Sequence, residues 1–270
     1  MGNKGIEIDG QDLSNLRFAD DIVLLSETPN ELQLMINELN RESLKIGLKM
    51  NKKKTKVIMN ELVQPEPIKL QDELLDSVKE YIYLGQLINA ETSFEAEITR
   101  RIRLGWSAFG RYNNILRGSL PLCLKRKVYN QCILPVMTYG SETWTTTKRI
   151  ERRLISAQRG MERCMLGISL KDRKRASWIR EQTKVDDILL KIKRKQWQWA
   201  GHVARRRDNR WTKTVTDWEI TGVKRPRGRP YTRWRDDIRK FDRKWKEKAQ
   251  DRNDWKHLGE AYVLQWNVTS

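Results

Sequence analysis

The sequence contains few of the residues that build disulfide scaffolds or Cys/His metal sites. Its 270 residues include three cysteines and two histidines. Cys123, Cys132 and Cys164 are too few and too irregularly spaced for a disulfide framework, and these side chains cannot form a zinc site at normal ligand spacings. We therefore expect reduced, buried thiols in an intracellular protein.

The sequence also lacks a long hydrophobic run. No apolar stretch approaches the roughly 18 residues that a transmembrane helix needs, and the mean hydropathy is −0.75. The N-terminal segment MGNKGIEIDG has no apolar stretch after its lysine, so it lacks the pattern of a signal peptide. These absences predict a protein of the nucleus and cytoplasm, with no membrane partner.

Basic residues, in contrast, are abundant and unevenly distributed. The formal net charge is +19, from 54 Lys and Arg against 35 Asp and Glu. Residues 1–90 hold 11 basic and 15 acidic side chains, which leaves 43 basic and 20 acidic ones for residues 91–270. A basic excess confined to one part of the chain favours a polyanionic partner, and nucleic acid is the default expectation.

Two adjacent aspartates, Asp20 and Asp21, interrupt the otherwise apolar stretch NLRFADDIVLLSE. The apolar residues on either side predict two strands of a β-hairpin with Ala19, Asp20 and Asp21 at its tip. Neighbouring carboxylates repel each other, and a divalent cation with oxygen ligands, such as Mg²⁺, would remove that cost. A plain surface turn is the alternative, since aspartate is common in turns.

The apolar periodicity predicts an α+β fold. After the first hairpin we expect a capped helix from Thr28 to Gly47, a short strand at 56–59 and a second hairpin at 78–89. From about residue 92 the period becomes helical, with further helices expected near 121–134, 147–166, 184–205 and 232–249. The predicted architecture is a small antiparallel sheet with one packed helix, followed by a mostly α-helical basic extension.

A series of motifs carries a family resemblance. FADDIVLLS, GLKMNKKKTKVI and YLGQLIN occur in this order, and TYGSETW and WAGHVARRRDNRW follow in the basic part. Together they resemble the C-terminal part of the endonuclease/reverse transcriptase of a non-LTR (LINE-type) retrotransposon. The resemblance implies an incomplete palm in 1–90, a thumb-like helical region in 91–146, a basic helical region in 147–222, and an Arg-rich linker with a terminal helix in 223–270.

The resemblance also implies roles for the paired aspartates. In this family the equivalent hairpin holds catalytic magnesium. Asp20 would be a direct Mg²⁺ ligand, Asp21 a second ligand or a supporting charge, and Phe18 an aromatic beneath the hairpin.

Two further segments receive implied roles. Lys54 would match a palm lysine near the incoming nucleotide, although the neighbouring lysines offer other registers and a solvated loop lysine is the alternative. Tyr83, Leu84 and Gly85 would help to grip the primer terminus. The implied partners are an RNA template and a DNA primer or target DNA.

Basic and aromatic side chains of the second part are candidates for nucleic-acid contacts. In the thumb-like region Arg100 and Arg103 suit contacts to the sugar–phosphate backbone, which position without reading sequence. Ordinary solvated charges are the alternative for each of them. Trp197 and Trp211 lie beside basic residues and are candidates for stacking on unpaired bases.

The segment KRPRGRP resembles the core of an AT-hook. Arg227 and Arg229 flank a glycine, and an extended Arg-Gly-Arg fits a narrow A·T minor groove, whose negative potential attracts arginine. A basic linker or nuclear-localisation signal is an equal alternative.

Some parts of such an enzyme are expected to be missing. Two-metal phosphoryl transfer needs carboxylates from more than one segment, and the sequence begins shortly before the paired aspartates. We expect this chain alone not to polymerise DNA, and the upstream reverse-transcriptase/endonuclease portion to be a partner. The alternatives are a non-catalytic DNA/RNA-binding protein derived from a retrotransposon, or a relic without a maintained role.

Overall fold

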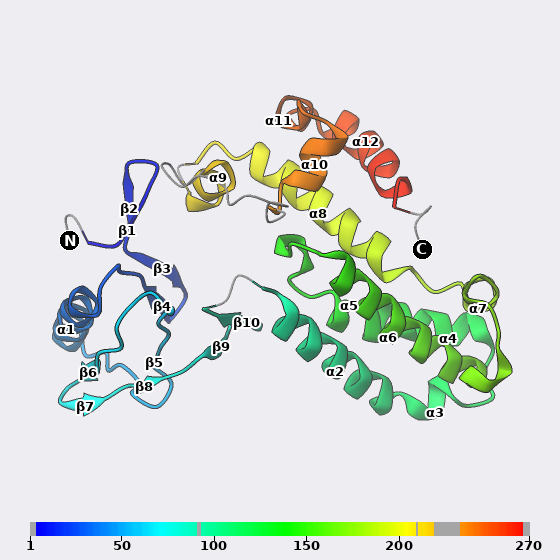
Figure 1. Cartoon of the computed structure of the whole chain (residues 1–270), viewed down its shortest axis with the longest axis horizontal. Coiled ribbons are helices and arrows are strands. Elements are labelled where there is room, and N and C mark those ends of the chain that lie inside the picture. Colours follow the sequence, from blue (N-terminus) through cyan, green and yellow to red (C-terminus); the bar gives the residue numbers. More distant parts are fainter. Residues whose placement is uncertain (1–3, 91–92, 209, 219–232, 267–270) are drawn as a thin grey trace. The chain divides into compact units, whose positions relative to one another are not determined.

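The computed structural model describes residues 4–90, 93–208, 210–218 and 233–266. The chain divides into two compact units (Figure 1). We call residues 1–92 with 209–221 the N-terminal unit, and residues 93–208 with 222–270 the helical unit. Helices together with small antiparallel strand pairs confirm the α+β class.

The N-terminal unit consists of short strands and two helices. Its elements are β1 (Ile6–Ile8), β2 (Gln11–Leu13), β3 (Asn15–Phe18), β4 (Asp21–Leu24), α1 (Pro29–Lys45), β5 (Lys56–Val57), β6 (Lys69–Leu70), β7 (Glu73–Leu74), β8 (Asp76–Ser77), β9 (Glu80–Tyr83), β10 (Gln86–Asn89) and α9 (Trp211–Asp217). Within the described residues each strand has one partner: β1–β2, β3–β4, β6–β7 and β9–β10 are antiparallel, and β5–β8 is parallel. Strand β5, Lys56–Val57, is shorter than the strand predicted at 56–59.

Helix α1 begins as the sequence predicts. Pro29 occupies the first turn, and the Thr28 hydroxyl accepts a hydrogen bond from the Glu31 N–H at 3.2 Å. The Glu31 carboxylate does not return to the cap, because it accepts from the Gly5 N–H at 2.8 Å. Gly47, with a φ of 79°, follows the end of the helix. The cap thus also ties α1 to the start of the chain.

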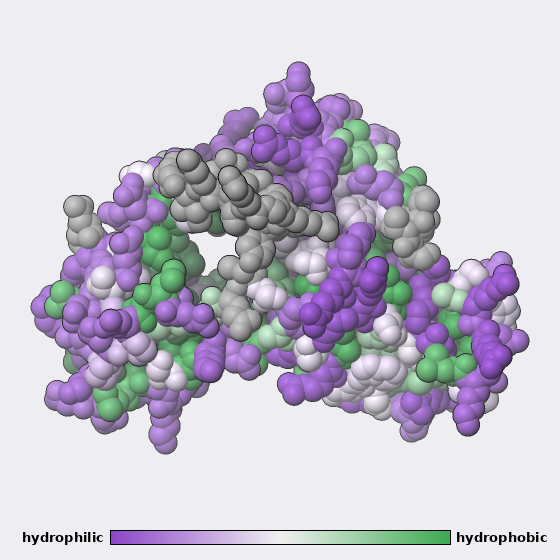
Figure 2. Space-filling model, viewed as in Figure 1, coloured by the Kyte–Doolittle hydropathy of each residue, from purple (hydrophilic) through white to green (hydrophobic). Residues whose placement is uncertain are grey.

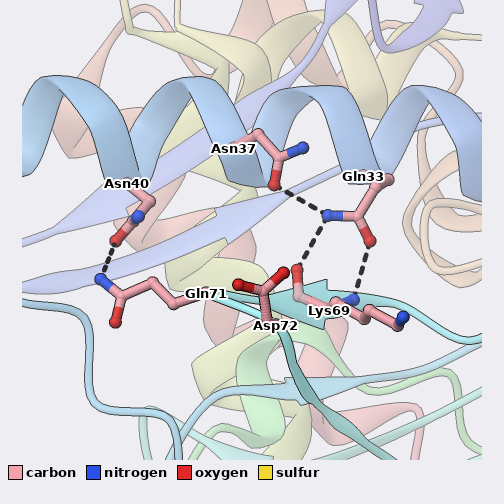
Figure 3. A pocket seen from close by; sticks show the side chains of 6 residues that line it. All are labelled: Gln33, Asn37, Asn40, Lys69, Gln71 and Asp72. Carbon is pink, nitrogen blue, oxygen red and sulfur yellow. Dashed lines mark hydrogen bonds between the residues drawn. The ribbon is translucent and has the colours of Figure 1, made fainter.

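Amide side chains of α1 hold the β6–β7 hairpin (Figure 3). The Gln33 carboxamide accepts from the Lys69 N–H at 2.7 Å and donates to the Lys69 carbonyl at 2.8 Å, as a neighbouring strand would. Gln33 also donates to Asn37 at 2.9 Å, and Gln71 donates to Asn40 at 3.1 Å. These side chains line a polar cavity of about 420 Å³. The apolar core beneath is small and consists of Ile36, Val57, Ile68, Leu70 and Leu75.

The helical unit is built from α-helices with short π and 3₁₀ segments. Its elements are α2 (Glu95–Arg111), α3 (Asn113–Leu116), α4 (Leu122–Val128), η1 (Tyr129–Ile133), α5 (Leu134–Met137), η2 (Ser141–Thr143), α6 (Lys148–Leu166), η3 (Leu170–Asp172), α7 (Ala176–Thr183), α8 (Ile188–Ala204), α10 (Asp236–Phe241), α11 (Trp245–Lys248) and α12 (Arg252–Leu264). The helices predicted near 121–134, 147–166 and 184–205 are present, the first as α4, η1 and the start of α5. No described helix is both long and apolar enough to cross a membrane.

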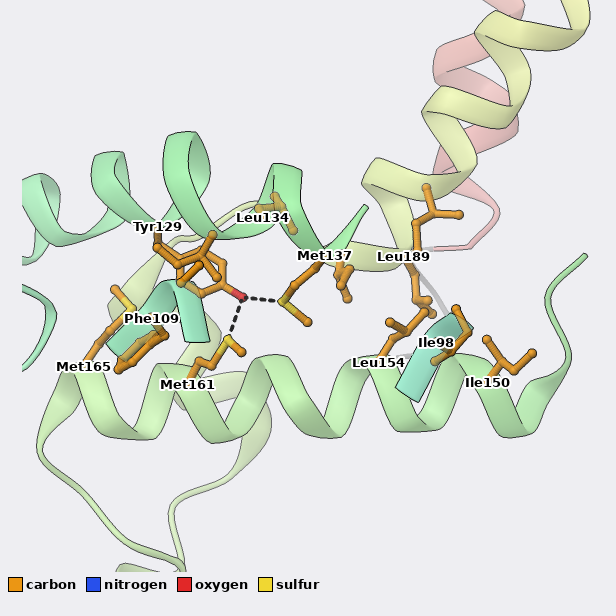
Figure 4. Packing of buried hydrophobic residues seen from close by; sticks show 14 of the residues in the cluster. Ile98, Phe109, Tyr129, Leu134, Met137, Ile150, Leu154, Met161, Met165 and Leu189 are labelled. Atoms are coloured by element: carbon orange, nitrogen blue, oxygen red, sulfur yellow. Dashed lines mark hydrogen bonds between the residues drawn. The ribbon is translucent and has the colours of Figure 1, made fainter. Parts of the chain in front are cut away.

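The larger core of the helical unit is formed by α2, α4–α6 and the start of α8 (Figure 4). Phe109 and Tyr129 are fully enclosed in it. The Tyr129 hydroxyl points at the sulfur atoms of Met137 and Met161, at 3.9 and 3.7 Å. Burial raises the pKa of Tyr129 above its usual value. The centre of the bundle is therefore apolar and fully enclosed.

A second core joins α8 to α12 through two tryptophans. The Trp197 and Trp255 rings stack with centroids 3.8 Å apart, and each indole N–H donates to the other residue's carbonyl, at 2.9 and 3.1 Å. Trp197 is buried, so the expectation that it stacks on bases is wrong. Trp211 is partly buried in α9 of the N-terminal unit.

The single helix predicted at 232–249 is wrong. The backbone is extended at Asp242, which ends α10, and the Asp242 carboxylate accepts from the Lys244 N–H at 2.8 Å. An aspartate that bonds the backbone in this way competes with a continuing helix. Helix α12 was not predicted, although its cap was readable: Asp251 accepts from the N–H groups of Asn253 and Asp254.

The cysteines are free, as expected, but they are not all buried. Cys123 is exposed, and Cys132 and Cys164 are partly buried. In α4 the inward position belongs to Lys125, whose ammonium donates to the Met165 carbonyl at 3.0 Å near the end of α6. The neighbouring Cys123 therefore lies outside the core.

Candidate functional site

The paired aspartates lie at the turn of the β3–β4 hairpin, as predicted. Phe18 and Asp21 are the last paired residues, which leaves Ala19 and Asp20 as the turn. Ala19 has a φ of 52°, in the left-handed region, and this tight reversal makes Asp20 and Asp21 consecutive exposed carboxylates. The hairpin thus presents two acids at one end.

One face of this hairpin carries exposed apolar side chains beside Asp21. Because Phe18 and Asp21 are directly opposite, their side chains are on the same face of the ladder. Phe18 is 62% exposed and Leu16, two residues earlier, is 39% exposed. Phe18 is therefore not packed beneath the hairpin, and that expectation is wrong. Figure 2 shows apolar residues at the surface of the N-terminal unit in this region.

The second predicted hairpin, β9–β10, belongs to the same unit as the first. Its turn consists of Leu84 and Gly85, with φ values of 47° and 77°. Tyr83 is partly buried, and its pKa is raised first by burial and then by the negative charge of Asp21. The charge of Asp21 therefore acts on the YLG segment as well as on the turn that carries it.

The lysine-rich turn is connected to the second hairpin. The Lys54 N–H donates to the carbonyl and side-chain oxygens of Asn51, both at 3.1 Å. The Lys54 carbonyl accepts from the Tyr81 hydroxyl at 3.1 Å. The Lys54 side chain is exposed. Tyr81 was not singled out in the sequence, although it lies two residues before Tyr83 with the strand alternation that places both on one face.

The lysines around Lys54 differ in their partners. Lys52 pairs with Glu73 at 2.7 Å, and Lys56 pairs with Asp76. Within the described part of the chain Lys54 has no carboxylate partner. Lys52 and Lys56 are therefore engaged with acids of β7 and β8, and the match of Lys54 to the palm lysine stays a prediction.

The acidic residues of the site do not form a metal centre by themselves. Among the described residues no group of three or more His, Cys, Asp and Glu side chains could hold a metal ion. Asp20 and Asp21 belong to one turn, whereas a two-metal site takes carboxylates from more than one segment. The residues of this chain that the structure describes therefore do not fit a complete magnesium site.

The candidate arginines of α2, in the helical unit, differ in whether their charge is available for contacts to nucleic acid. The buried Glu97 carboxylate accepts from Arg100 at 2.8 Å and from Arg101 at 2.6 Å. Arg101 also lies over the Tyr139 ring, 4.6 Å from its centroid. Arg100 is therefore partly neutralised, while Arg103 is exposed. Arg227 and Arg229 lie outside the described residues.

Comparisons with known proteins agree with the sequence motifs. Residues 5–88 match the family model of reverse transcriptases (RNA-dependent DNA polymerases). The chain is also 37% identical over 283 residues to an uncharacterized transposon-derived protein of Caenorhabditis elegans, and this match covers 98% of the chain and 100% of the relative. No solved structure matches the chain. The matched residues 5–88 include the β3–β4 hairpin, the lysine-rich turn and all but the last residue of the β9–β10 hairpin.

Proposed function

The chain belongs to the reverse-transcriptase family of transposon-derived proteins, and from this premise we propose that it forms part of the polymerase of a non-LTR retrotransposon. The N-terminal unit would be the C-terminal part of the palm, and the helical unit would bind the template–primer duplex. The partners would be an RNA template and a DNA primer or target DNA. The observation that carries the proposal is that one compact unit holds the DD hairpin, the YLG hairpin and the Lys54 turn, with the Tyr81 hydroxyl bonded to the Lys54 carbonyl.

In this proposal the two aspartates are one half of a metal site. Asp20 and Asp21 supply carboxylates, and a further carboxylate-bearing segment has to complete the set, because the described residues contain no third ligand. Lys54 has an exposed ammonium without a carboxylate partner in the described residues, which suits it to neutralise the charge of a nucleotide triphosphate.

A second candidate function is non-catalytic binding of DNA or RNA. The incomplete acid set favours it, together with the basic excess of residues 91–270. The two functions differ in whether Asp20 matters. Polymerisation depends on its charge, whereas binding through basic side chains does not.

Primer extension on an RNA template tests the proposal. The isolated chain with Mg²⁺ is expected to give no extension. Addition of the upstream palm and fingers of the same element, fused or in trans, is expected to restore it. In the completed enzyme Asp20→Asn should lower the rate by about 10²–10³-fold, the usual cost of losing a charged group aimed at the transition state.

Asp12→Asn is the matched control, because Asp12 is an exposed aspartate of β2 in the same unit. It should leave extension unchanged. Extension by the isolated chain would contradict the proposed incompleteness. Equal rates for Asp20→Asn and the parent enzyme would contradict the assigned role of Asp20, and no extension by the completed enzyme would favour non-catalytic binding.

A further inference from the structure

The helical unit contains basic side chains of two kinds, and those of the first kind are paired with acids inside the bundle. Arg159 pairs with Glu162 and lies 3.3 Å from Asp187, and Lys193 lies 2.7 Å from Asp237. Both basic side chains are buried. These cations join neighbouring helices, and the carboxylates beside them neutralise their charge.

Basic side chains of the second kind are concentrated in the segment between α6 and α7. Lys171, Arg173, Lys174 and Arg175 fall within five consecutive residues, and each of them is exposed. Across the described parts of the chain none of the four has a carboxylate within ion-pair distance. We call residues 169–175 the basic loop. The run KDRKR was visible in the sequence, but the sequence alone did not distinguish its charges from the paired ones.

The single acid of the basic loop, Asp172, accepts hydrogen bonds from Ser169. The Asp172 carboxylate accepts from the Ser169 N–H at 2.7 Å and from the Ser169 hydroxyl at 2.9 Å. The Ser169 oxygen in turn accepts from the Lys171 N–H at 3.2 Å. These bonds lower the pKa of Asp172. They also fix the turn, so Asp172 acts as a structural residue while the neighbouring cations extend into solvent.

One cation–π contact and one exposed apolar side chain complete the surroundings of the basic loop. The region around α7 is mostly hydrophilic in Figure 2. Lys174 lies over the Trp178 ring, 5.2 Å from its centroid, which anchors the end of the loop to α7. Leu170, 76% exposed, is the loop's one large apolar side chain. A single leucine offers too little apolar area to insert into a lipid surface.

We propose that the basic loop is a binding surface for the sugar–phosphate backbone of a nucleic acid. This inference rests on the proposed nucleic-acid role of the chain and assigns that role to a specific surface. Lysine and arginine that lack protein carboxylates gain most from phosphate contacts, and such contacts position the strand without reading its sequence. Each phosphate that is neutralised releases counterions, so the contribution of the loop is measurable as salt dependence.

The test is the binding of the full chain to a labelled RNA–DNA heteroduplex at several salt concentrations. The variant is Lys171→Ala/Arg173→Asn/Arg175→Ala; asparagine replaces Arg173 because its φ of 48° disfavours alanine. If each cation neutralises one phosphate, the slope of log K against log salt should decrease by about two to three, at roughly 0.9 per phosphate. Circular dichroism should show unchanged helix content, since the substituted side chains are exposed.

A charge-matched control separates the contribution of the basic loop to the slope from that of the net charge. Lys148→Ala/Arg149→Ala/Arg194→Ala removes the same charge from the same unit, at side chains that are exposed and lie near acids. Its slope should change by less than about one. An equal decrease in the control would overturn the assignment to the loop.

The remaining outcomes separate the inference from the function on which it rests. If the parent chain binds the heteroduplex and the loop variant keeps the full slope, the inference is wrong while the proposed function stands. If the parent chain does not bind, the proposed function is wrong as well. Loss of binding to phosphatidylserine vesicles with an unchanged heteroduplex slope would assign the loop to anionic lipid and overturn the inference.

Discussion

Replacing Gly201 with alanine is expected to destabilise the helical unit by about 3 kcal/mol or more, the upper range for overpacking a dense core. A Cβ atom at Gly201 would lie 2.1 Å from Nε1 of Trp255 and 2.5 Å from its Cδ1. These atoms belong to a rigid indole that is buried against α8, so the ring has little room to move. The clash would also break the hydrogen bond from the Trp255 indole to the Trp197 carbonyl.

The sensitivity of this position follows from a reciprocal arrangement of two helices. In α8 a tryptophan precedes a glycine by four residues, Trp197 and Gly201, and in α12 Trp255 and Gly259 have the same spacing. Each indole lies over the glycine of the other helix. A Cβ at Gly259 would lie 2.8 Å from Cδ1 of Trp197. The two glycines therefore allow the close contact that stacks the tryptophans, and Gly259→Ala should also destabilise.

Chemical denaturation followed by tryptophan fluorescence measures this effect, because the stacked pair is disrupted on unfolding. Gly110→Ala is the matched control: Gly110 lies in α2, and a Cβ there would meet no atom within 4 Å. That substitution should be neutral or stabilising by up to about 1 kcal/mol, since alanine favours helix more than glycine. Equal stabilities of Gly201→Ala and Gly110→Ala would contradict the packing described here.

Replacing Lys193 with methionine is expected to cost about 3–5 kcal/mol, the usual result of removing one partner of a buried ion pair. The Lys193 side chain is 1% exposed, and its ammonium lies 2.7 Å from Asp237 and 3.9 Å from Glu151. It also donates to the Thr146 hydroxyl at 3.2 Å and lies 3.9 Å from the Trp266 ring centroid. Methionine fills a similar volume but removes the counter-charge of Asp237 and leaves Glu151 with the exposed Lys148 as its cation.

Thermal unfolding measures this loss, with Arg194→Met as the control. Arg194 is the next residue of α8, but its side chain is 44% exposed and its nearest acid, Glu260, is 3.9 Å away. Its replacement should change stability by about 0.5 kcal/mol or less. In the double variant Lys193→Met/Asp237→Asn the cost should be smaller than the sum of the single costs, since the two residues are coupled. Strict additivity would show that the buried ion pair is not the source of the loss.

The site was predictable as far as its elements are local in sequence. The β3–β4 and β9–β10 hairpins were predicted because each depends on a few consecutive residues, a tight turn between two short apolar runs. The start of α1 was predicted for the same reason, from Thr28 and Pro29. The contact between Tyr81 and Lys54 was not predicted, because 27 residues separate them and no local pattern connects them.

The ion-pair partners of individual arginines and lysines could not be assigned from composition. Arg100 and Lys171 are both basic residues in a basic region, yet Arg100 pairs with the buried Glu97 and Lys171 has no carboxylate partner among the described residues. Pairing depends on which acid the fold brings within reach. The same holds for Trp197, whose basic neighbours in sequence suggested exposure, while its actual neighbour is Trp255, 58 residues away.

The sequence by itself determined the turns, the helix caps, the α+β class and the excess of positive charge, because each of these depends on adjacent side chains or on composition. The tertiary structure alone decided which acids neutralise which cations and which aromatic residues are buried. It also decided that the second hairpin and the lysine-rich turn are joined by a hydrogen bond. These properties depend on distances between segments far apart in the chain, and such distances are set by packing rather than by local pattern.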